Sequence, residues 1–116
     1  MATVSMRRLA ALCIIAFATA CQRSPEQQHS DKLRSDAQQQ GAAIENQAGR
    51  QANQLEAQAA ALDNGAQQAG GYTGQRLKVR ADALTKEAKI IRKQADMQAD
   101  AVREAADAQA KTSESR

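Results

Sequence analysis

Small and apolar side chains recur every eleven residues in the first half of the chain. Two rows follow this step: Leu33, Ile44, Leu55 and Ala37, Ala48, Ala59. Eleven residues make three turns of about 3.67 residues each, so both rows stay on one side of a nearly straight helix. Ser30 offers an N-cap and Asp31 an acid in the first turn. The pattern therefore predicts a helix over 30–69 with a single apolar seam.

The second half changes to a seven-residue pattern and predicts a helix over 75–111. Its seam alternates large and small side chains at steps of four and three: Leu77, Ala81, Leu84, Ala88, Ile91, Ala95, Gln98, Val102 and Ala105. This alternation lets two helix axes approach closely, as in alanine-rich antiparallel coiled coils. Val79, Ile90 and Met97 fall within about 20° of one another on the opposite side. This second stripe predicts a contact with another copy of the chain or with a protein partner.

Glycines interrupt the pattern between the two predicted helices. The segment 70–74 reads Gly-Gly-Tyr-Thr-Gly and is rich in residues that tolerate left-handed backbone conformations. Arms of nearly equal length around a glycine-rich turn favour a hairpin over one continuous rod. We therefore expect an all-α fold: a long alanine-rich helical hairpin, or antiparallel coiled coil, with a frayed tail at 112–116. Large apolar side chains are few, so an alternative is an 11-residue-repeat protective protein that is marginally folded or disordered when alone.

The amino-terminal residues have the pattern of a secretory signal. Arg7 and Arg8 precede a short apolar run, and small residues lead to Cys21 in Ala18-Thr19-Ala20-Cys21. The apolar run is too short to cross a membrane, which takes about 20 residues. A plain secretory signal cut after Ala20 fits the same residues, but a cysteine beside the cut favours lipid attachment. We expect a signal peptide at 1–20, then a lipidated Cys21 and a flexible tether at 21–29.

The residues around Cys21 resemble the lipobox of bacterial lipoproteins, in which that cysteine receives a diacylglycerol. With an alanine-rich helical region behind it, the layout resembles the small outer-membrane lipoproteins of the murein-lipoprotein (Braun) type. The resemblance implies a lipid anchor in the outer membrane and a chain facing the periplasm, and Gln22 in place of Asp agrees with that location. The family joins a C-terminal lysine to peptidoglycan. This chain ends in Arg116, so any peptidoglycan contact is expected to be non-covalent.

Candidate catalytic groups are scarce. Cys13 would leave with the signal peptide and Cys21 would carry lipid, so no thiol would remain for a disulfide, a metal or catalysis. His29 is the single histidine and has no neighbouring cysteine or paired carboxylate. No nucleophile elbow, phosphate-binding glycine loop or HExxH motif is present. The sequence predicts a protein that is not an enzyme and that has no cofactor or metal, with a structural or protein-interaction role in the envelope.

Positive charge is concentrated between residues 76 and 93. Seven basic residues face only two acids, Asp82 and Glu87, in this stretch: Arg76, Lys78, Arg80, Lys86, Lys89, Arg92 and Lys93. One interpretation is a surface that binds anionic lipid or the cell wall. The other is a solvated coiled-coil exterior whose charges select a partner helix. Nucleic acid is not an expected partner, because the stretch lacks interleaved aromatic residues and the signal directs the chain out of the cytoplasm.

Overall fold

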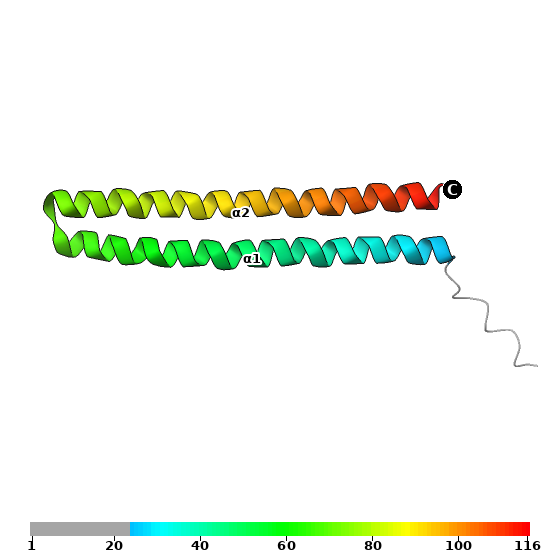
Figure 1. The fold of residues 1–116 in the computed structure, drawn as a ribbon, viewed down its shortest axis with the longest axis horizontal. Coiled ribbons are helices and arrows are strands. Elements are labelled where there is room, and N and C mark those ends of the chain that lie inside the picture. The colour runs from blue at the N-terminus through cyan, green and yellow to red at the C-terminus, as the bar shows by residue number, and fades with distance from the viewer. Residues whose placement is uncertain (1–23) are drawn as a thin grey trace, which may run out of the picture.

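The computed structural model describes residues 24–116, which form two long antiparallel α-helices. Helix α1 spans Pro25–Ala69 and helix α2 spans Gly71–Glu114, with Gly70 between them. The helices lie side by side along their whole length, and the C-terminus returns to the start of α1 (Figure 1). Each is about 66 Å long at 1.5 Å per residue. The predicted all-α hairpin is confirmed.

Helix α1 begins earlier than the sequence pattern predicted. Ser24 is the N-cap, and its side-chain Oγ accepts a hydrogen bond from the backbone N–H of Gln27 at 3.3 Å. Pro25 takes the first helical position, where its missing N–H costs nothing because that group has no partner within the helix. The predicted tether over 21–29 is therefore wrong for residues 25–29. The proline that suggested a tether is instead compatible with a helix start.

The turn is also shorter than the predicted segment 70–74. Gly70 has φ 62° and Gly71 has φ 53°, values in the left-handed region that glycine adopts without a steric penalty. The Gly70 N–H donates to the Ala66 carbonyl at 3.1 Å, which closes the last turn of α1. Two left-handed residues suffice to reverse the chain, so residues 71–74 already belong to α2. Helix α2 also continues to Glu114, past the predicted end at 111.

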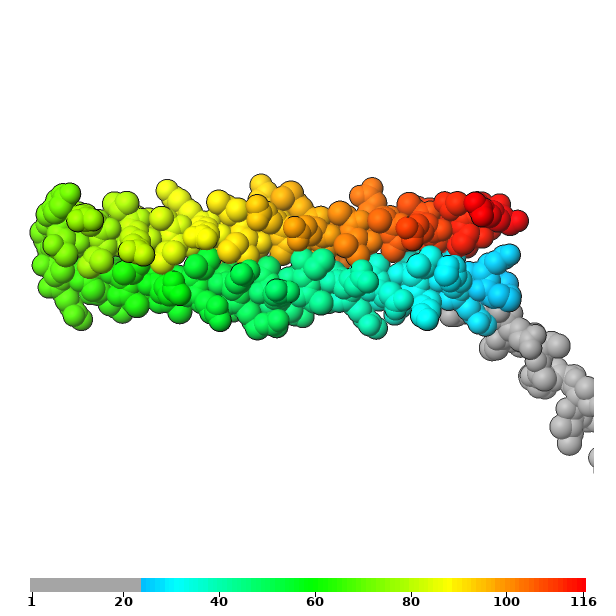
Figure 2. Space-filling model, in the orientation of Figure 1, coloured from blue at the N-terminus to red at the C-terminus, as the bar shows by residue number. Residues whose placement is uncertain are grey.

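The interface between the helices is built from small side chains. Among residues 24–116, the buried positions are alanines, two glycines and one serine: Ser30, Ala37, Gly41, Ala48, Ala52, Ala59 and Ala66 on α1, and Gly74, Ala81, Ala88, Ala95, Ala99, Ala106 and Ala110 on α2. The larger aliphatic residues of both predicted seams, such as Leu55 and Leu84, are only half-buried. We call the small buried set the alanine seam. It brings the helices into contact along their length (Figure 2).

One register holds along the alanine seam. At the free end of the hairpin the Ser30 hydroxyl donates to the Ala110 carbonyl at 3.3 Å. At the turn end, Gly74 lies so close to Ala66 that an added Cβ would be 2.5 Å from the Ala66 carbonyl oxygen. In both pairs the residue numbers sum to 140. The two arms therefore pair without slippage from the turn to the free end.

The seam of α2 departs from the predicted heptads towards its C-terminus. Ala81, Ala88 and Ala95 are buried, but Gln98 and Ala105 are exposed, and the buried positions pass to Ala99 and Ala106. A straight helix drifts by about 20° per heptad, and a step of eleven residues corrects that drift. The free-end half of α2 thus uses eleven-residue spacing, as α1 does at the same level.

Three arginines connect the helices across the margins of the seam. Arg34 bonds to Asp107 and Glu114, Arg103 bonds to Glu45, and Arg92 bonds to Glu56. The Arg92 guanidinium contacts both carboxylate oxygens of Glu56, a geometry that a lysine cannot provide. The hydrogen bond from Arg92 lowers the pKa of Glu56 below the usual 4.5. These partly exposed pairs add directional contacts to an otherwise apolar seam.

The close approach at Gly74 predicts opposite outcomes for two glycine-to-alanine substitutions. Gly74→Ala places a methyl group against the Ala66 backbone, so the helices must separate locally, at a cost of about 1–3 kcal/mol. Gly49→Ala is the matched control because a Cβ there meets nothing within 4 Å, and alanine favours the helix by up to about 1 kcal/mol. Thermal unfolding followed by circular dichroism compares the two variants. A Gly74→Ala variant as stable as Gly49→Ala would contradict the described register.

The ion pair at Glu56 predicts a specific pH dependence. Because its folded-state pKa is lowered, Glu56 stabilises the hairpin above about pH 4.5, and this contribution is lost as the pH falls through the folded-state pKa. Carboxyl carbon shifts in an NMR titration should give Glu56 a pKa below 4.5, and Arg92→Gln should raise it. An unchanged titration of Glu56 in the Arg92→Gln variant would show that the two side chains do not pair in solution.

Candidate functional site

The outer face of α2 near the turn carries the large apolar side chains that the hairpin leaves in solvent. Tyr72, Val79, Ile90 and Met97 are 75%, 70%, 56% and 56% exposed. Their spacings of seven, eleven and seven residues place all four within about 20° around the helix. We call these four residues the apolar line. It extends about 38 Å along the rod, on the side of α2 away from the alanine seam.

Tyr72 is a member of the apolar line that the sequence pattern missed. The sequence pattern places Tyr72 in the glycine-rich segment 70–74 between the helices, whereas the structure places it at the start of α2. The available signal was its position seven residues before Val79. The guanidinium carbon of Arg76 lies 5.9 Å from the centroid of the Tyr72 ring, within the range of a cation–π contact. The line therefore begins with an aromatic residue that is already paired with a cation.

The structure divides the seven predicted basic residues into two groups. Arg92 points to α1, where its guanidinium donates to the Asn53 side-chain oxygen at 2.8 Å as well as to Glu56. The remaining six project within about 110° of the apolar line, on both of its sides. They are Arg76, Lys78, Arg80, Lys86, Lys89 and Lys93, all exposed. Arg92 is therefore an interhelical residue, and the other six form a basic border around the line.

The basic border keeps its charges largely available. None of the ion pairs between residues 24–116 involves any of its six members. Within 51–93, the half of the hairpin next to the turn, seven basic residues face four acidic ones. The other half, 24–50 with 94–116, has six basic and nine acidic residues. The rod thus has a positive turn half and a negative free-end half.

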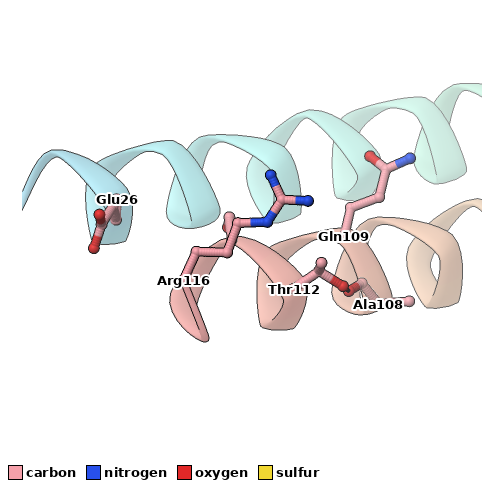
Figure 3. Close-up of a pocket in the computed structure, with 6 residues that line it drawn as sticks. Glu26, Ala108, Gln109, Thr112 and Arg116 are labelled. Carbon is pink, nitrogen blue, oxygen red and sulfur yellow. Dashed lines mark hydrogen bonds between the residues drawn. The ribbon is translucent and has the colours of Figure 1, made fainter.

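A second feature of the hairpin is a groove between its free ends. The groove between the free ends is lined by one carboxylate and one guanidinium, from Glu26 and Arg116 (Figure 3). Its two hydroxyls, of Thr112 and Ser113, donate to backbone carbonyls in their own helix. The hydrogen bonds of these hydroxyls join them to the two carbonyls and to the Ser30 hydroxyl, so neither hydroxyl is paired with the Glu26 carboxylate as a nucleophile with its base. The groove at this end of the rod therefore shows no hydroxyl paired with a base.

Two structural features bear on metals and membranes. The described part of the chain contains no cluster of three or more His, Cys, Asp or Glu side chains that could hold a metal ion. Neither α1 nor α2 has a stretch long and apolar enough to span a bilayer. The predicted signal peptide and Cys21 lie outside the described residues.

The outer face of α2, with its apolar line and basic border, is thus the candidate contact surface of the hairpin. Val79, Ile90 and Met97, predicted to mediate association, lie together on it, and so do six of the seven predicted basic residues. Comparison with known proteins adds no assignment, because no family model, curated protein or solved structure matches the chain.

Proposed function

We propose that the chain is a non-enzymatic envelope lipoprotein with a structural or protein-interaction role. Cys21 carries the lipid and anchors the chain to the outer membrane, and the hairpin extends into the periplasm. The observation that carries the proposal is the combination of a lipobox-like Ala18-Thr19-Ala20-Cys21 with a register-locked rod. The rod presents an unpartnered apolar line on its outer face.

The hairpin topology supports a role as a projecting element. Helix α1 starts only a few residues after Cys21, and α2 returns the C-terminus to the same end (Figure 1). The turn at Gly70 is therefore the most remote point from the anchor, about 66 Å away along the helix. Three of the four residues of the apolar line, Tyr72, Val79 and Ile90, lie in this remote half of the rod, and Met97 lies just beyond the midpoint. An anchored chain would hold its contact surface at a fixed distance from the attachment point.

The interaction role is supported by the exposure of the apolar line. Side chains such as Val79 and Ile90 gain roughly 1.5–3 kcal/mol each when they are fully buried, and the isolated hairpin forgoes that gain. Another copy of the chain or an envelope protein could bury these side chains. A purely passive spacer would not need four large apolar residues in line on its surface.

Lipid attachment at Cys21 is tested by mass and by fractionation. Intact mass spectrometry of the membrane-associated protein should show a mature chain beginning at Cys21 with a diacylglyceryl addition. Cys21→Ser should release the protein into the soluble fraction, because acyl chains contribute about 0.8 kcal/mol per buried CH₂ to membrane binding. Cys13→Ser is the matched control and should leave the fractionation unchanged. A mature chain with a free thiol at residue 21 would overturn the anchor.

A further inference from the structure

We infer that the outer face of α2 docks on the surface of a bilayer that contains anionic lipids. The inference rests on the proposed envelope role, because it gives the rod a membrane to meet. It differs from that role in one respect, because lipid and not a protein buries the apolar line and the docked rod lies along the membrane: the apolar line enters the interfacial region while the basic border binds anionic headgroups.

The first step is the arrangement of apolar and basic residues on one face. The apolar line lies along the centre of the face, and the six members of the basic border lie on both sides of it. Surface-lying helices combine these two features, since their apolar side chains enter the headgroup boundary and their cations contact anionic lipids. Lysine stems cover apolar surface while their ammonium groups reach the phosphates. The face provides both halves of this recognition.

The second step is the rigidity and direction of the face. Ala81, Ala88 and Ala95 lie between about 160° and 180° around the helix from Val79. Docking therefore leaves the alanine seam closed. Because α1 braces α2 from behind, the four residues of the apolar line are already aligned before contact. The helix does not have to fold on the membrane, so the ordering cost that a disordered segment would incur is avoided.

The third step argues against a second copy of the chain as the preferred partner that buries the apolar line. Two such faces pressed together would bring two basic borders of six cations each into one interface, with three acids, Asp82, Glu87 and Asp96, along the apolar line (72–97) of each chain. Like charges at an interface are unfavourable. A soluble anion would neutralise the border but leave the apolar line in water. An anionic bilayer pairs with the cations of the basic border and buries the side chains of the apolar line at the same time.

Vesicle cosedimentation of a chain comprising residues 22–116 tests the inference without the lipid anchor. All contacts described above between α1 and α2 lie within this chain. Binding should be strong to phosphatidylglycerol-containing vesicles and weak to phosphatidylcholine vesicles, and it should fall with added salt. The quadruple variant Lys78→Gln, Lys86→Gln, Lys89→Gln, Lys93→Gln should lose about fivefold in affinity per lysine, more than a hundredfold in total.

The apolar line is tested by Val79→Gln, Ile90→Gln and Met97→Gln combined. This variant should bind anionic vesicles at least tenfold more weakly, while its binding to soluble polyphosphate should be unchanged. The matched control is Ala42→Gln, Ala57→Gln and Ala60→Gln, three exposed positions on α1, and it should bind as the wild type does. Circular dichroism verifies that each variant keeps its helix content.

Several results would overturn the inference. Equal binding to both kinds of vesicle, or full binding by the apolar-line variant, would contradict a bilayer contact that uses charge and apolar residues together. Sedimentation of the wild type as a dimer that the apolar-line variant abolishes would assign the face to a second copy. Because the tested chain lacks Cys21, these results are independent of lipidation. A failed anchor and a failed docking face are thus distinguished.

Discussion

Close packing of small side chains is the constraint on which the hairpin depends. With alanine, glycine and serine at the buried positions, the two helices approach until backbone and methyl groups touch. Larger side chains cannot enter this space, so the leucines and isoleucines of the seven- and eleven-residue patterns lie at its margins. The apolar line is exposed for a different reason: it lies on the side of α2 opposite the seam, where the hairpin has no element to cover it.

Arginine side chains complement a seam that has little directionality of its own. Methyl groups at regular intervals would permit other registers of the two helices, because each alanine resembles the next and polar residues are what specify register. Arg34, Arg92 and Arg103 each reach a carboxylate on the opposite helix, and the Ser30 hydroxyl marks the free end. Partly exposed pairs of this kind contribute little energy each. Their value is that a shifted register would separate all of them at once.

Much of this fold could be predicted from the sequence, because the spacing of alanines directly reflects helix geometry. The hairpin follows from that spacing and from the glycines at 70 and 71. The exact helix ends do not, since Pro25 is equally compatible with a tether and with a helix start. The heptad pattern also did not predict that Ala99 is buried in place of Gln98, because this shift arises from rotation that accumulates along a straight helix. At the candidate site, Arg92 could not be separated from the other cations without knowing which side of α2 faces Glu56. Tyr72 could not be recognised as part of the apolar line, because it lies among the glycines of the expected turn.

The position of both termini at one end of the rod has a mechanical consequence. Tension between the start of α1 and the end of α2 would load the seam one layer at a time, beginning at Ser30 and Ala110. A load of this kind separates the helices progressively from the free end, and each pair of small buried residues offers little resistance. Tension between the start of α1 and the turn is carried instead along the helix axis, by backbone hydrogen bonds in series. The hairpin is therefore compliant when its two ends are pulled apart and stiff when it is pulled along its length.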